Sequence, residues 1–256
     1  MNAPDPTHPL LPEAVVRYAG HSDALVDVHL PPGGGPHRLV VLVHGGFWKQ
    51  EWDRLHQRPM ARALVEADCV VAAVEYRRVG PGSDGGWPTT ALDVEAAVTA
   101  LPGLLEGLGI ATTTPTLVGH SAGGHLVLWL AARGPHEPDP WTRVVSLAGV
   151  ADLRAAAADR LGDGATQALL GGEPDEVPEH YAAADPMTLL GPDTTQRILL
   201  VHGVDDAVVP VSQSRALAAA HPGIELREID GVGHMELVEP GSGAWPMVVA
   251  AVLGQS

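Results

Sequence analysis

The chain has 256 residues, of which 45% are hydrophobic and 18% charged, so it can bury a large core without covalent or metal cross-links. Its formal net charge of −16 argues against nucleic acid and anionic membrane surfaces as partners. Cys69 is the only cysteine, which excludes an internal disulfide, and its apolar surroundings favour a core residue over a nucleophile.

The chain begins with a proline-rich stretch. Residues 1–12 hold four prolines and predict a flexible tail. This stretch lacks the basic and apolar regions of a signal peptide, and no apolar run reaches membrane-spanning length. We therefore expect a cytoplasmic protein without a membrane partner. Two short β-rich stretches follow at 14–20 and 24–30, and we expect them to form an antiparallel pair.

From residue 38 onward, strand-like and helix-like stretches alternate. Buried-strand patterns occur at 38–43, 69–76, 115–119, 143–150, 197–203 and 224–230. Helical patterns occur at 54–67, 87–109, 122–133, 211–221 and 243–253. We expect Thr89 or Thr90 to cap the second helix and Pro102 to end or kink it. This alternation predicts a single α/β domain over 13–256, built on a doubly wound, mostly parallel sheet.

One segment interrupts the alternation. Residues 151–192 have helical character and no strand pattern. In a sheet protein such an insertion lies on the rim, where it forms a cap, a lid or a subunit contact. We expect the protein to be a monomer or a homodimer.

The most informative motif is G-x-S-x-G, formed by Gly119 to Gly123 with Ser121 at its centre. A strand pattern precedes it and a helix pattern follows it, as a nucleophile elbow requires. The serine oxygen then stands at the carboxyl end of a central strand, where open α/β sheets bind their ligands. Ser121 is therefore the candidate nucleophile.

A serine hydroxyl needs a base, and the base needs an orienting acid. His234 lies in the glycine-bracketed segment 230–237, after the last predicted strand. An earlier loop, in 201–210, offers the adjacent carboxylates Asp205 and Asp206. The chain order serine, aspartate, histidine is that of a triad on an α/β sheet, with either aspartate as the acid.

The third requirement is an oxyanion hole. Its first backbone N–H donor is normally the residue after the nucleophile, here Ala122. A second donor comes from the loop after an early strand, where Gly45 and Gly46 allow the backbone N–H groups to turn inward.

Four motifs together resemble the α/β-hydrolase-fold serine hydrolases, and in particular the carboxylesterase and kynurenine formamidase (arylformamidase) group. They are HGGFW (44–48), GHSAGGHL (119–126), HGVDDAVVP (202–210) and GVGHMEL (231–237). The resemblance spans about residues 38–253. It implies that Asp206 is the triad acid, that Gly46 with Phe47 supplies the second oxyanion donor, and that the reaction needs no cofactor.

The substrate pocket is less defined by the sequence. Trp48, His120 and Trp87 are candidate pocket residues, with Phe47 and Trp52 as further aromatic candidates. The 13 histidines show no H-x-x-x-H or H-E-x-x-H spacing, so we expect no metal site.

The sequence therefore predicts a serine hydrolase that acts on a small carboxylic ester through an acyl-enzyme. Hydrolysis of an aryl formamide such as N-formylkynurenine is the alternative within the same chemistry. Two hypotheses from other classes are a non-catalytic binding module on a hydrolase scaffold and a lyase that uses the same triad.

Overall fold

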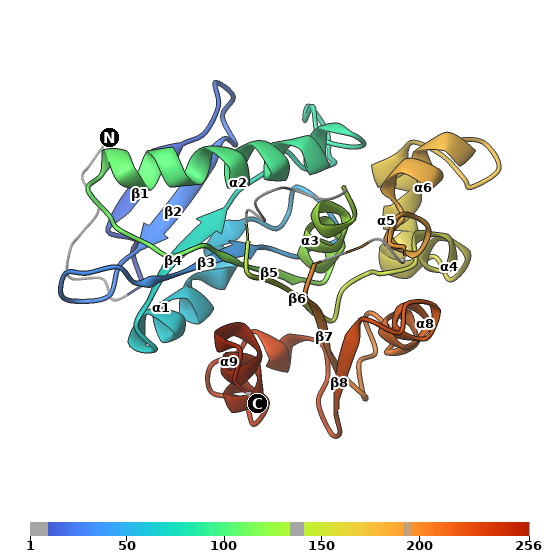
Figure 1. The fold of residues 1–256 in the computed structure, drawn as a ribbon. Coiled ribbons are helices and arrows are strands. Elements are labelled where there is room, and N and C mark those ends of the chain that lie inside the picture. Colours follow the sequence, from blue (N-terminus) through green and yellow to red (C-terminus); the bar gives the residue numbers. More distant parts are fainter. Residues whose placement is uncertain (1–9, 134–140, 192–193, 195, 256) are drawn as a thin grey trace.

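The computed structural model describes residues 10–133, 141–191, 194 and 196–255, so most of the predicted tail 1–12 lies outside the described residues. One eight-stranded sheet runs through the described chain in the order β1-β2-β4-β3-β5-β6-β7-β8, with helices on both faces (Figure 1). The mostly parallel, doubly wound architecture predicted from the sequence is confirmed.

The strands lie close to their predicted ranges. They are β1 (Ala14–Arg17), β2 (Leu25–His29), β3 (Arg38–Val43), β4 (Cys69–Val74), β5 (Thr116–His120), β6 (Arg143–Leu147), β7 (Ile198–Gly203) and β8 (Glu225–Ile229). The predicted opening pair is confirmed, because β1 pairs antiparallel with β2, and β2 then pairs antiparallel with β4. All other neighbouring strands are parallel.

The helices divide between the two faces. The main ones are α1 (Arg58–Glu66), α2 (Thr89–Gly107), α3 (Ala122–Ala132), α8 (Ser212–Ala220) and α9 (Trp245–Leu253). The buried residues of α2 and α3 share one apolar cluster with one face of the sheet, and those of α1 and α9 share a second cluster with the other face (Figure 1). Both faces of the central strands are therefore buried, which is why β4 and β7 are apolar almost throughout.

Three helical predictions need correction. Helix α2 continues through Pro102 to Gly107, because Leu101 and Leu105 bury their side chains in the core on either side of the proline. Its N-cap residue is Pro88, and Thr90 instead accepts a hydrogen bond from the Gly86 N–H through its Oγ1. The predicted helix 54–67 is divided into a 3₁₀ turn, η1 (Arg54–Gln57), and α1.

The insertion 151–192 is helical where it is described. It forms α4 (Leu153–Ala158), α5 (Leu161–Leu170), α6 (Pro178–Ala184) and α7 (Pro186–Leu189), which gather at one side of the sheet in Figure 1. Helix α7 contacts both α3 and α8, so the insertion packs on the helical layer that follows the candidate nucleophile. Its role as a cap stays a prediction.

Two features bear on environment and reactivity. Among the helices of the described residues, none has both the length and the apolar character needed to cross a bilayer.

Cys69 is fully buried on β4, and burial raises the pKa of its thiol to about 11. A thiol with that pKa stays protonated near neutral pH, as expected for a core residue.

A buried ion cluster fixes the edge of the sheet beside the site. The fully buried carboxylate of Asp27 on β2 accepts hydrogen bonds from Arg54 Nε at 2.8 Å and from Arg58 Nη2 at 2.8 Å. Arg54 also lies 3.5 Å from Glu75, the residue that follows β4. The cluster therefore links the antiparallel edge to the turn that leads into α1.

Removing one partner of a buried ion cluster leaves the others without compensation. We expect Asp27→Ala to lower the free energy of unfolding by about 3–5 kcal/mol, measured by urea denaturation. The matched control is Glu225→Ala, which breaks the exposed 2.7 Å pair with Arg227 and is expected to cost less than about 1 kcal/mol. Equal effects of the two variants would contradict this account of the cluster.

Candidate active site

The candidate residues meet at the carboxyl ends of neighbouring parallel strands. The loop holding Gly45 and Gly46 follows β3, and Ser121 follows β5, which pairs with β3 through Val43 and Gly119. On the far side of β3 lies β4, so the strand order reverses between β3 and β5. Such a reversal opens a crevice at the carboxyl edge of a parallel sheet, where ligands bind.

Ser121 stands on a strained turn between β5 and α3. Its backbone angles are φ 54° and ψ −116°, a conformation that non-glycine residues rarely adopt. The neighbouring chain passes so close that side chains do not fit. A Cβ on Gly119 would lie 2.1 Å from the Gly123 oxygen, and one on Gly123 would lie 2.0 Å from the Val43 oxygen. The two glycines of the motif are therefore required by close packing around the serine.

His234 and Asp206 form a short contact between two loops at this edge. His234 Nδ1 donates to Asp206 Oδ2 at 2.6 Å. Because Nδ1 carries this proton, Nε2 is the nitrogen left to accept one. The structure therefore brings together the predicted base and Asp206, whereas Asp205 is exposed.

The Asp206 carboxylate is held as an ion. Its Oδ1 accepts from the N–H groups of Val208 and Val209, both at 2.8 Å, and its Oδ2 lies 3.3 Å from His202 Nε2. Burial alone raises the pKa of this carboxyl, but hydrogen bonds from His202, His234 and Val209 outweigh burial and hold the pKa well below its usual range. The associated stability is thus present above the unfolded-state pKa and is lost only as the pH falls through the lowered one.

His120 supports the loop that carries His234 through a hydrogen bond and a ring contact. Its Nε2 donates to the His234 carbonyl at 3.1 Å, and the two rings lie with their centroids 4.5 Å apart. Burial first, and the adjacent His234 second, keep the pKa of His120 well below its usual range. His120 is therefore a neutral positioning group between the candidate nucleophile and the candidate base.

The loop after β3 has an unusual backbone. Gly46, Phe47 and Trp48 all have positive φ, at 105°, 51° and 57°. A Cβ on Gly46 would lie 2.3 Å from the Cβ of Trp52, so only glycine fits there. These angles mark a tightly folded loop next to Ser121.

A buried histidine supports this loop. His44 Nδ1 donates to the Gly45 carbonyl at 2.8 Å, and its Nε2 lies 2.9 Å from Glu75 Oε1. Its ring stacks on Tyr76 at 4.2 Å, and the Tyr76 hydroxyl donates to the His44 carbonyl. Burial opposes ionisation of Glu75, but His44, Arg78 and the Arg54 N–H outweigh burial and lower the Glu75 pKa. The loop after β3 is therefore supported by hydrogen bonds from His44 and Tyr76 and by the ionised Glu75 carboxylate.

The insertion touches the same loop. Lys49, the only lysine of the chain, donates from Nζ to the Gly162 carbonyl at 2.8 Å. A Cβ on Gly162 would lie 2.6 Å from the Phe47 ring, so the glycine packs flat against the ring. Arg160, Gly162, Asp163 and Gly164 all have left-handed angles, which fold this part of α5 into a tight turn. The insertion is therefore coupled to the loop beside Ser121.

A cavity of about 270 Å³ opens at Ser121. Its lining residues are Gly46, Phe47, Trp52, His56, His120, Ser121, Val208, His234 and Met235. Of the predicted pocket residues, His120, Phe47 and Trp52 line this cavity, but Trp48 and Trp87 are not among its lining. Trp48 is buried edge-on against His125, and Trp87 packs edge-on against Trp129.

Sequence reasoning missed His56, Val208 and Met235 as lining residues. Val208 and Met235 lie within two residues of Asp206 and His234, and this proximity is a signal available in the sequence. His56 has no such signal, because the 3₁₀ turn η1 brings it to the cavity. Burial first, and His44 second, lower the pKa of His56, so its ring is neutral near pH 7.

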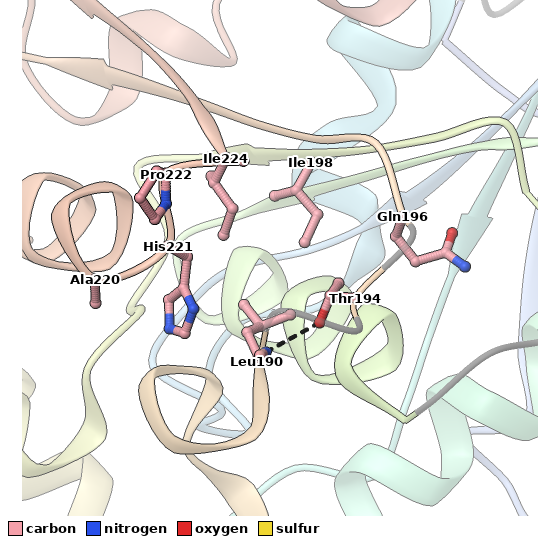
Figure 2. Close-up of a pocket in the computed structure, with 10 residues that line it drawn as sticks. Leu190, Thr194, Gln196, Ile198, Ala220, His221, Pro222 and Ile224 are labelled. Atoms are coloured by element: carbon pink, nitrogen blue, oxygen red, sulfur yellow. Dashed lines mark hydrogen bonds between the residues drawn. The ribbon is translucent and has the colours of Figure 1, made fainter.

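A second hollow, of about 320 Å³, lies at the opposite edge of the sheet. Figure 2 shows that its lining comes from the start of β7 at Ile198, from Leu190, Thr194 and Gln196, and from the α8–β8 connection at His221 to Ile224. The only hydrogen bond drawn there joins the Gly191 N–H to Thr194 Oγ1 at 3.1 Å. This hollow faces the amino ends of the strands, away from the candidate triad.

Within the part of the chain that the structure describes, no three histidine, cysteine or acidic side chains gather in a way that would hold a metal ion. The polar side chains that line the cavity are those of Ser121 and of His56, His120 and His234.

The strained serine at a strand-to-helix turn, on a sheet of this order, defines an α/β-hydrolase-fold protein. Within that class the chain belongs to the BD-FAE family, which matches residues 26–220. The match includes three of the four motifs and stops before His234.

Similar proteins include named esterases and lipases. The chain is 30% identical to the monoacylglycerol lipase of Mycolicibacterium smegmatis over 247 residues, covering 82% of this chain and 85% of that protein. It is 26% identical to Esterase LipQ of Mycobacterium tuberculosis over 216 residues, covering 78% of this chain but only 50% of LipQ. The chain thus spans about half the length of LipQ.

Solved structures share the fold. A structure described as a truncated form of carbohydrate esterase from gut microbiota superposes with a TM-score of 0.76 at 20% identity, covering 93% of this chain and 92% of that one. At this identity the likeness shows the fold alone.

Gly123 leaves no room for a larger side chain at the turn that carries Ser121. Gly123→Ala forces a methyl group against the Val43 carbonyl, and we expect it to lower the free energy of unfolding by about 1–3 kcal/mol. Gly103→Ala is the matched control, because a Cβ there, in the interior of α2, meets nothing within 4 Å. The control is expected to stabilise the protein by about 0.5–1 kcal/mol in thermal denaturation. An unchanged free energy of unfolding in Gly123→Ala would contradict the close approach of the Val43 carbonyl to Gly123.

Proposed function

We propose that the protein is a serine hydrolase that cleaves carboxylic esters. The observation that carries this proposal is the 2.6 Å hydrogen bond from His234 Nδ1 to the ionised Asp206, in a cavity that Ser121 also lines. Because Nδ1 is engaged with the carboxylate, Nε2 is the nitrogen available to accept the serine proton, as triad catalysis needs.

In the proposed mechanism, Ser121 Oγ attacks the ester carbonyl while His234 Nε2 takes the hydroxyl proton. The tetrahedral intermediate collapses to an acyl-enzyme, and His234 returns the proton to the departing alcohol. A water molecule, deprotonated by the same nitrogen, then releases the acid and restores Ser121. Asp206 stabilises the imidazolium that forms in each step.

The negative charge of the intermediate is assigned to backbone donors. These are the N–H of Ala122, at the start of α3, and that of Gly46 or Phe47 in the loop after β3. Each such donor contributes roughly 10²–10³ in rate in related chemistry. The buried His44–Glu75 pair supports this proposal, because it fixes the loop before any charge develops.

The comparisons favour an ester over other substrates. The relatives reported above are called an esterase and a lipase, and this chain shares their family features. Hydrolysis of an aryl formamide stays a prediction from the sequence, since a formamide presents the same carbonyl to the serine. Parallel assays of p-nitrophenyl acetate and N-formylkynurenine separate the two substrates. A binding module would turn over neither.

The nucleophile is tested by Ser121→Ala. We expect kcat for p-nitrophenyl acetate to fall by roughly 10⁶-fold, because no other group replaces the serine oxygen. Ser146→Ala is the matched control. Ser146 is also buried, on the adjacent strand β6, and its hydroxyl has no hydrogen-bond partner among the described residues. Turnover that survives in Ser121→Ala would end the serine proposal.

The choice of acid is tested by Asp206→Asn and Asp205→Asn. An asparagine at 206 accepts less strongly and disturbs the tautomer of His234, so we expect kcat to fall by roughly 10⁴-fold. Asp205 is exposed, and its variant is expected to stay within a few-fold of the parent. Steady-state kinetics at pH 8 measure both, and a larger loss in Asp205→Asn would reverse the assignment.

A further inference from the structure

Exposed apolar side chains gather at the mouth of the Ser121 cavity. Among the described residues, eight large apolar side chains are exposed, and three of these line that cavity. They are Trp52, Val208 and Met235, with 47%, 42% and 39% of their surface exposed. Single exposed apolar residues are ordinary, but three around one opening mark a binding surface.

These three residues come from the loops that carry three of the proposed groups, namely the oxyanion glycine Gly46, Asp206 and His234. Trp52 ends the loop that contains Gly46, Val208 lies two residues after Asp206, and Met235 follows His234 directly. The backbone contacts that position the catalytic groups therefore also position the apolar side chains. We call this surface of Trp52, Val208 and Met235 the apolar rim.

Two members of the apolar rim are held in place. The Trp52 carbonyl accepts a hydrogen bond from Arg78 Nη1 at 2.6 Å, and its ring packs edge-on against His56 at 5.5 Å. The Val208 N–H donates to Asp206 at 2.8 Å. Met235, in contrast, is unbranched and adaptable. A ligand would therefore contact two side chains that are already positioned, Trp52 and Val208, and one that can change its rotamer, Met235. The positioned side chains lower the entropic cost of binding.

The cavity is small. Its volume of about 270 Å³ lies near the lower end of the range of small-molecule sites, which begins at about 300 Å³. An ester longer than this cavity extends through the mouth and meets the apolar rim. None of the lining residues is aspartate, glutamate, lysine or arginine, and His56 and His120 are held neutral by burial. This lining, together with the exposed apolar side chains at the mouth, favours an uncharged extending group.

We propose that the apolar rim binds an uncharged apolar group of the ester that extends beyond the cavity, and so selects esters with a longer aliphatic part over acetates. This inference rests on the proposed function. The two proposals can fail separately, because the proposed function requires only that some ester be cleaved at Ser121, whereas this inference requires a preference for longer esters.

The test measures kcat/KM for p-nitrophenyl acetate, butyrate, hexanoate and octanoate, each below its critical micelle concentration. Once the chain reaches the apolar rim, we expect about a twofold rise per added methylene, which corresponds to half-burial of each. Met235→Gln and Val208→Thr keep the size of the side chain but make it polar. Each is expected to lower the ratio of the octanoate to the acetate value about fivefold.

Met247→Gln is the matched control, because Met247 is 46% exposed on α9 and does not line the cavity. Its ratio is expected to equal that of the parent. An unchanged ratio in Met235→Gln and Val208→Thr, with ester turnover intact, overturns the inference and leaves the proposed function standing. The longer esters are also assayed above the critical micelle concentration, and activity that appears only there overturns the inference in favour of a lipid surface. No turnover of any ester by the parent overturns both.

Discussion

The hydrogen bond between His234 and Asp206 is the contact on which the site depends. The two residues follow the adjacent strands β8 and β7, and the close approach of Gly203 to the Val232 carbonyl brings their loops together. A short bond from Nδ1 to an ionised acceptor settles which imidazole nitrogen is free. His120 ends β5, which β6 separates from β7, and it donates to the His234 carbonyl, while the strained Ser121 lines the same cavity as His234.

A second constraint is the support of the loop after β3. Its three consecutive positive φ angles would be costly in isolation, on the order of 1–3 kcal/mol each for non-glycine residues. The surroundings offset that cost: His44 and Glu75 hold the loop from below, and Lys49 ties it to Gly162 in the insertion. The insertion therefore bears on the loop assigned to oxyanion binding, although none of its described residues lines the cavity.

Much of the fold and the core of the site followed from the sequence, because both rest on local rules. Strand and helix periods predicted the parallel sheet, and the spacing around Ser121 predicted the elbow that close packing enforces. Side-chain directions were not predictable in the same way. Trp52 lines the cavity as predicted, but the left-handed backbone at Phe47 and Trp48 turns Trp48 into the core, which no pattern of residue types reveals. Likewise, the burial of Leu101 and Leu105 carried α2 through Pro102.

The central claim is that Ser121 is an activated nucleophile. The most direct measurement is mass spectrometry of the protein after incubation with a fluorophosphonate, followed by peptide mapping. The account predicts one adduct, on the peptide that contains Ser121, formed at a rate that falls sharply when His234 is replaced by alanine. An adduct on another serine, or no adduct while the protein cleaves esters, would contradict it.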